Sequence, residues 1–208
     1  MTTQPEPKLA PPGAGLPKVE LLIARILFAL RRWRGDRLSF DAGFQRERER
    51  IRLLVGGCDA ATGARQVLIR RPAGLEDSSR NWSLWMTLDH LQIVHHEIAR
   101  VIGALVRGVI PEGTASTAAV KPRSEAGPKV VAMFEASCDA LASIVAASPN
   151  LNTSVRFAHP WFGPLTAAGW HALAGEHMGI HRLQIERILA GLEMDLRHEK
   201  NGHANAAT

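Results

Sequence analysis

The chain has 208 residues, 46% hydrophobic and 22% charged, which is typical of a globular protein with one packed domain and an extension. Average glycine and proline contents and only two cysteines exclude collagen-like, low-complexity and disulfide-scaffold classes. Cys58 and Cys138 lie far apart without a CxxC partner, which excludes a zinc ribbon or a thioredoxin-type motif. We expect both to be reduced cytosolic thiols.

The net charge of +5 belongs to the first quarter of the chain. Residues 1–58 contain eleven Lys and Arg against six Asp and Glu, whereas residues 59–208 contain fourteen of each. A groove for DNA needs surplus positive charge on the folded body, and this body is neutral. The distribution of charge therefore argues against a nucleic-acid partner.

The N-terminal segment differs in composition from the rest of the chain. Residues 1–17 are polar and proline-rich, so we expect a disordered tail, and their lack of a signal-peptide pattern predicts a cytoplasmic protein. Residues 18–38 are expected to form a basic amphipathic helical extension, because apolar residues recur at helical spacing from Val19 to Trp33. The stretch identified as most apolar, Val19–Leu30, is too short and too polar to span a bilayer, so no transmembrane segment is expected.

Two roles are open for this amphipathic helix. Its apolar face could pack on its own domain or on a partner subunit, for example in a homodimer, and this is the interpretation we favour. Alternatively, its combination of apolar and basic residues could place it on an anionic membrane surface.

Helical periodicity continues along the rest of the chain. The predicted elements are a helix from Phe40 with Ser39 as its N-cap, a helical piece within 59–71, a long helix at 82–107, a helix at 129–147 and a last helix that is capped by Thr166 and continues to about residue 195. The connections are loops at 72–80, 111–128 and 150–164, and residues 196–208 are read as a polar tail. No segment alternates with period two between turns, so we expect no sheet and an all-α helical bundle.

The last of these helices carries the most informative polar residues. Its apolar stripe runs from Leu173 to Ile188, and His177, His181 and Gln184 occupy positions on that stripe. Buried polar groups are costly unless they find partners. Two imidazoles four residues apart share one face, with Cβ atoms about 6 Å apart, and can bind one metal ion. Spacing alone leaves two hydrogen-bonded histidines as the alternative.

A third ligand would have to come from another helix, and the segment 82–107 offers candidates. His90 and His95 flank its apolar face on opposite sides, so periodicity does not choose between them. Glu97 lies two turns from His90 on nearly the same line and is a candidate carboxylate beside the site. A solvated surface glutamate is the more common role for such a residue.

Two motifs, in the same order, resemble the DinB-like superfamily. The run NWSLWMTLDHL, residues 81–91, is similar to the second helix of that family, in which a WS start precedes a histidine ligand by about two turns. The run HPWFGPLT at 159–166 and the run HMGIHRLQ at 177–184 resemble the family's HP-x-FG-x-LT loop and HxxxHxxQ helix. The likeness covers about residues 39–192, while the N-terminal helix departs from the family pattern.

The resemblance implies an up-down-down-up four-helix bundle over residues 39–195, preceded here by the extra amphipathic helix. It implies a divalent metal site formed by His90, His177 and His181. Helical phase makes Gln184 and Glu97 the candidate orienting groups beside this site. Zn²⁺, Ni²⁺ and Fe²⁺ all accept imidazole, so the ligands do not name the ion. The expected function is that of a metal-dependent thiol S-transferase or hydrolase acting on a small molecule, such as a low-molecular-weight thiol.

The competing interpretation is a non-catalytic assembly or interaction protein whose metal site is structural or vestigial and whose basic N-terminal helix serves assembly. His159 is expected to cap or pack its own loop rather than bind a metal ion. The tryptophans are expected to pack at the bundle end rather than to stack on bases, namely Trp82, Trp85, Trp161 and Trp170.

Overall fold

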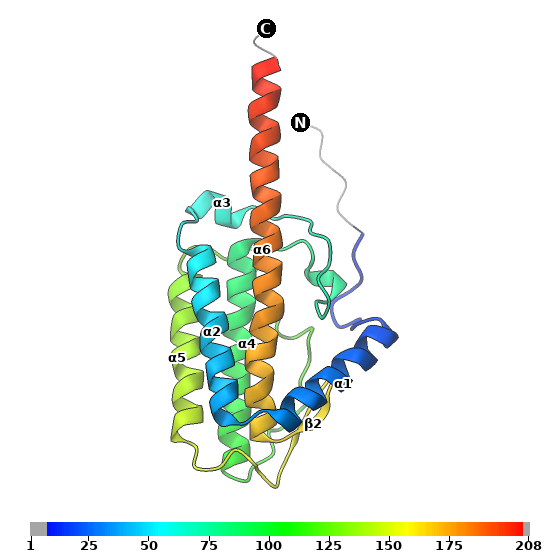
Figure 1. The fold of residues 1–208 in the computed structure, drawn as a ribbon, viewed down its shortest axis with the longest axis vertical. Helices are drawn as coiled ribbons and strands as arrows, with labels where there is room; N and C mark the ends of the chain where they lie inside the picture. The colour runs from blue at the N-terminus through cyan, green and yellow to red at the C-terminus, as the bar shows by residue number, and fades with distance from the viewer. Residues whose placement is uncertain (1–7, 206–208) are drawn as a thin grey trace.

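The computed structural model describes residues 8–205 of the chain. Its body is a four-helix bundle, as predicted, made of α2 (Arg37–Val55), α4 (Leu84–Val106), α5 (Val130–Ala147) and α6 (Ala167–Asn205). The helix α1 (Lys18–Arg34) lies against the side of this bundle (Figure 1). Two short elements, α3 (Ala60–Ala64) and the 3-10 helix η1 (Asp77–Ser79), lie in the connection between α2 and α4.

A long connection determines the topology of the bundle. In Figure 1, α2 and α6 run upward, whereas α4 and α5 run downward. Because α4 and α5 are parallel neighbours, the segment 107–129 has to return along the bundle before α5 can begin. The up-down-down-up order implied by the resemblance is confirmed.

A single hydrophobic core joins the four helices. Its largest fully buried side chains include Ile51, Leu84, Trp85, Leu88, Leu91, Ile98, Ile102, Leu105, Phe134, Leu141 and Met178. Burying apolar surface stabilises the fold by roughly 25 cal/mol per Å². Among the described residues, α5 is the one helix whose length and composition would suit a membrane span, and Phe134 and Leu141 place its inner face in this core. The most apolar stretch is therefore α5 and not Val19–Leu30. Alanines on the outer face of α5 add to the apolar side chains of its inner face.

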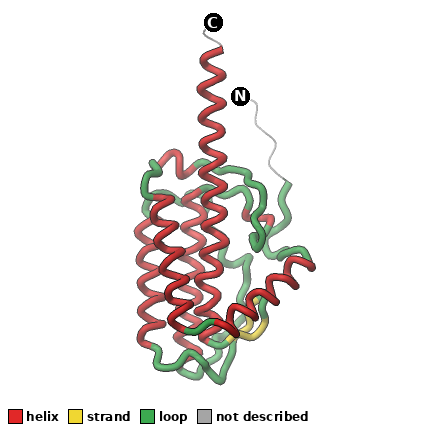
Figure 2. The backbone as a smooth tube through the Cα atoms, viewed as in Figure 1, coloured by secondary structure: helices red, strands yellow, loops and turns green. Residues whose placement is uncertain are grey.

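Some predicted boundaries were wrong for local reasons. The N-cap of α2 is Asp36 and not Ser39, because the Asp36 carboxylate accepts the Ser39 N–H at 2.9 Å and the Ser39 hydroxyl accepts the Asp36 N–H at 2.9 Å. Of the piece within 59–71, only α3 is helical. The connection after α5 contains an antiparallel hairpin of β1 (Phe157–His159) and β2 (Gly163–Leu165), drawn yellow in Figure 2. Strands of three residues are too short to show a period-two pattern.

Both ends of the chain also differ from the prediction. Residues 8–17 are not a disordered tail where the structure describes them, since the Ala10 N–H donates to Asp77 at 2.8 Å and Leu16 is buried. Residues 1–7 lie outside the described part. At the other end α6 continues to Asn205, so most of the expected polar tail is helical backbone, and 206–208 lie outside the described residues.

Helix α1 is attached to the bundle at a few points. Phe28 is its buried side chain and packs on Phe162 of the hairpin, with ring centroids 4.5 Å apart. Glu20 accepts hydrogen bonds from the Arg71 guanidinium and from the Gly74 N–H, and Arg71 lowers the pKa of the Glu20 carboxyl. These contacts hold the helix against the side of the bundle.

The apolar face predicted for this helix is not buried on its own domain. Its members remain substantially exposed, namely Val19, Leu22, Ile23, Ile26, Leu27, Leu30 and Trp33. The periodicity correctly predicted an amphipathic helix, but it did not predict which side would face the bundle. The buried contact comes from Phe28, next to the predicted stripe.

We predict that Phe28→Ala releases α1 without unfolding the bundle. Removing a buried phenyl ring costs about 3–5 kcal/mol, and the remaining contacts of α1 are mostly partly exposed ion pairs that contribute little. Hydrogen exchange across residues 18–34 should become at least about tenfold faster while α4 stays protected. Leu22→Ala, on the exposed side of the same helix, is the control. Identical exchange of α1 in the two variants would contradict the prediction.

Candidate metal centre

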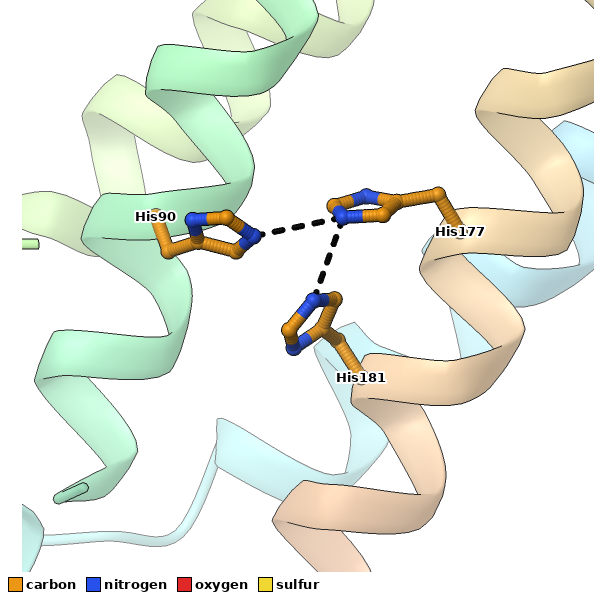
Figure 3. Close-up of side chains that lie close together, drawn as sticks. All are labelled: His90, His177 and His181. Carbon is orange, nitrogen blue, oxygen red and sulfur yellow. Dashed lines mark hydrogen bonds between the residues drawn. The ribbon is translucent and has the colours of Figure 1, made fainter. Parts of the chain in front are cut away.

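Three histidine side chains from two helices converge beside the core of the bundle (Figure 3). Nε2 of His177 in α6 lies 3.2 Å from Nε2 of His90 in α4 and 3.2 Å from Nε2 of His181, one turn further along α6. One ligand nitrogen from each ring lies within 4.8 Å of the other two. The structure therefore brings together the three residues that the sequence analysis selected.

Burial keeps this cluster uncharged. His90 and His181 are buried and His177 is half-buried. Removal from water lowers the pKa of His90 to about 4 and lowers the pKa of His177 and His181 well below the ordinary value. All three rings are thus neutral at neutral pH, and the neutral imidazole is the form that binds a metal ion.

Hydrogen bonds on the outer side of the cluster determine the tautomer of two rings. Nδ1 of His90 lies 2.6 Å from the carbonyl oxygen of Val120, which can only accept, so this Nδ1 carries the proton. The side chain of Gln184 donates from Nε2 to the Ser79 carbonyl at 2.7 Å, and its Oε1 accepts from Nδ1 of His181 at 2.6 Å. Both rings consequently direct an unprotonated Nε2 toward the centre.

The long connection between α4 and α5 supplies one of these orienting groups. Val120 is held beside His90 because Asp89, the preceding residue of α4, is fully buried and accepts the Arg123 N–H at 2.9 Å and the Arg123 guanidinium. Burial acts to raise the pKa of the Asp89 carboxyl, but the bonds from Arg123 outweigh it and lower the pKa. The connection between the parallel helices α4 and α5 is thus held next to the histidine cluster.

Trp82 forms one wall of the histidine cluster, although the sequence predicted that it would pack at the end of the bundle. Its ring lies parallel to the His181 ring, with centroids 6.1 Å apart, and 5.1 Å from the centroid of His90. The expectation that Trp82 only packs at the bundle end is therefore too limited. The sequence signal for a place beside His90 was the position of Trp82, just before the Ser83 N-cap and about two turns ahead of His90.

Other candidate residues lie outside the cluster. His95 is fully buried and its Nδ1 pairs with the Ser137 hydroxyl at 3.0 Å, on another side of α4 from His90. Glu97 pairs with Arg100 at 2.9 Å and has no contact with the histidines, so its predicted orienting role is wrong. Glu97 lies seven positions after His90, which places it about 10 Å further along the axis of α4.

The structure also places other residues that the sequence singled out. Gln184 is the predicted orienting group, and Thr166 accepts the Gly169 N–H at 3.2 Å at the start of α6. His159 accepts the Trp161 N–H at 3.2 Å within its own loop, as expected. Cys58 and Cys138 are both free.

The donor set fits a divalent cation. Imidazole nitrogens bound at 2.0–2.1 Å to a tetrahedral ion lie about 3.3 Å apart, close to the two 3.2 Å separations in this cluster. Without an ion, the single ring proton of His177 can satisfy only one of the two lone pairs that His90 and His181 present. Among the side chains that the structure describes, no other His, Cys, Asp or Glu completes the group, which leaves a coordination position open.

A cavity of about 620 Å³ gives access to the cluster, and all three histidines form part of its wall. Its other walls come from α1, the hairpin and the connection between α4 and α5. A small molecule can therefore reach the candidate metal centre.

Comparisons with known proteins support the fold and go no further. No family model matches the chain, and no curated protein matches it. A solved structure described as that of TT2238, a four-helix bundle protein, is similar with a TM-score of 0.55 and 20% sequence identity. The likeness covers 73% of this chain and 98% of that chain. At this identity it shows a shared fold alone.

We predict that metal-free protein at neutral pH carries its proton on Nδ1 in both His90 and His181. Long-range ¹⁵N–¹H spectra of the histidine rings distinguish the two tautomers. Gln184→Leu removes the acceptor for His181 and should change the signals of that ring, with His90 as the internal control. An Nε2–H form at either position in the unaltered protein would contradict the assignment.

Proposed function

We propose that the chain is a DinB-like metal-dependent enzyme, a thiol S-transferase or hydrolase acting on a small molecule, with His90, His177 and His181 binding one divalent ion. The observation that carries this proposal is the convergence of three neutral imidazole nitrogens, two of them oriented by hydrogen bonds on the far side of the ring. The order of the motifs and the topology of the bundle are consistent with it.

The residues around the cluster have distinct parts in this proposal. A divalent ion held by three imidazoles lowers the pKa of a bound water or thiol and polarises a carbonyl group. Gln184 and the Val120 carbonyl keep the ligand nitrogens pointing inward, and the Trp82 ring covers His90 and His181 on one side. The cavity admits a substrate from the other side. Zn²⁺, Ni²⁺ and Fe²⁺ are all compatible with these ligands.

The test is His181→Ala. This variant should lose the bound metal, expected at one equivalent in the unaltered protein, and should lose activity on a panel of thiols and esters. The bundle should still fold, because Met178 and Ile185 keep the apolar face of α6 in the core. The matched control is His96→Ala, which alters an exposed histidine of α4 and should change neither property. The readouts are metal analysis of protein without a histidine tag, activity and thermal unfolding.

Two results of this test would overturn the catalytic proposal. Full activity in a demonstrably metal-free variant would exclude a role of the metal in the reaction. Collapse of the fold together with metal loss would identify the ion as structural, although three-ligand sites are characteristic of catalytic metals.

The exposed face of α1 favours a second function, assembly of copies of this chain. Leu22, Ile26 and Trp33 are 58%, 60% and 79% exposed, and contiguous apolar surface of this kind commonly marks an interface. In this interpretation two α1 helices cover each other in a homodimer.

We predict that the double variant Leu22→Glu and Ile26→Glu lowers the molecular mass in solution from dimer to monomer, because it places charges in the proposed interface. Light scattering coupled to size exclusion measures this mass. Exchanging Lys18 for Glu at the exposed start of the same helix controls for the change in net charge. A monomeric unaltered protein at all accessible concentrations would rule out the assembly function.

A further inference from the structure

The wall of the cavity beside the three histidines is predominantly apolar. Side chains from α1, α4, the hairpin and α6 contribute to it, among them Ile23, Leu27, Val94, Ile98, Phe162 and Leu173. Ile23 and Leu27 are 52% and 60% exposed, although they face a concave surface of the same chain. An occupant of the cavity would remove this apolar area from water, which is favourable.

The cavity is elongated along the bundle. On α4 its wall extends from His90 to Val101, and on the antiparallel α6 from His181 back to Trp170. Each stretch contains twelve residues, whose first and last members lie about 16 Å apart along the helix axis. The histidines thus lie at one end of a long slot, and the hairpin end of the bundle lies at the other.

The charged groups in this wall already have partners of opposite charge. The four ion pairs join Glu20 with Arg71, Arg31 with Glu176, Glu76 with Lys121, and Glu97 with Arg100. Every Lys, Arg, Asp or Glu that lines the cavity belongs to one of them. The described wall therefore has no unpaired charge for the several ionised groups of a polar peptide-like thiol. Its predominantly apolar remainder can contact an uncharged hydrocarbon body.

We propose that this cavity binds an organic molecule with one metal-ligating head group, such as a carboxylate or a thiolate, and a long apolar body. The head lies at the three-histidine centre, and the body extends along the slot between α4 and α6 under α1. The inference rests on the proposed metal centre, and it narrows the substrate class to long-chain apolar compounds instead of small polar thiols.

The probes are acetohydroxamate, hexanohydroxamate and decanohydroxamate, which share one metal-ligating head and differ only in chain length. Titration of the zinc-loaded protein by calorimetry should show affinity increasing with length. Decanohydroxamate should bind at least about tenfold more tightly than hexanohydroxamate, because each buried methylene contributes up to about fourfold in affinity.

A pair of matched variants locates the apolar body. Ile23→Gln with Leu27→Gln alters the face of α1 that lines the cavity, and should reduce decanohydroxamate affinity at least about tenfold while leaving acetohydroxamate affinity unchanged. Leu38→Gln with Leu53→Gln alters two exposed leucines of α2 that lie outside the cavity wall, and should leave both affinities unchanged.

The outcomes separate this inference from the proposed function. Tight binding of acetohydroxamate with no dependence on chain length would overturn the apolar-body assignment and leave the metal centre intact. Equal binding of decanohydroxamate with and without zinc would show that the head does not reach the histidines, and would overturn the stated orientation. Failure of the protein to bind zinc would remove the metal centre and this inference together.

Discussion

The hydrogen bonds on the outer side of the histidine rings are the interactions on which the candidate site depends. A neutral imidazole has one proton, and here the Val120 carbonyl and the Gln184 amide hold that proton on Nδ1 in His90 and His181. Both remaining lone pairs therefore point at His177. Without these acceptors the rings could exchange protons among themselves and form an ordinary buried hydrogen-bonded cluster. Their orientation is what makes the cluster suitable for a cation.

The topology of the bundle supplies these acceptors. Parallel packing of α4 against α5 requires a connection that returns along the bundle, and this connection carries Val120 past His90. The bonds from Arg123 to the buried Asp89 fasten it at that point. The carbonyl of Ser79, in the connection between α2 and α4, orients Gln184 in the same way. Segments without regular structure thus determine the chemistry of side chains on regular helices.

The two sides of helix α1 have different surroundings. Its inner side closes the long cavity through Ile23, Leu27 and Phe28, whereas its outer side presents Leu22 and Ile26 to solvent. A metal centre at the end of an apolar slot differs from one in an open polar cleft, because the wall selects the body of a ligand while the ion selects its head. The same helix can therefore affect both substrate choice and association of copies.

Sequence periodicity and motif spacing alone predicted the bundle helices, the HxxxH pair and Gln184, because a helix places residues four apart on one face whatever surrounds it. The choice of His90 over His95 required the family resemblance, since both flank the same apolar face. Only the tertiary structure decided the parts played by Trp82, Val120 and Ser79, and the exclusion of Glu97. These contacts join segments far apart in the chain, and local sequence patterns carry no information on which distant segments will meet.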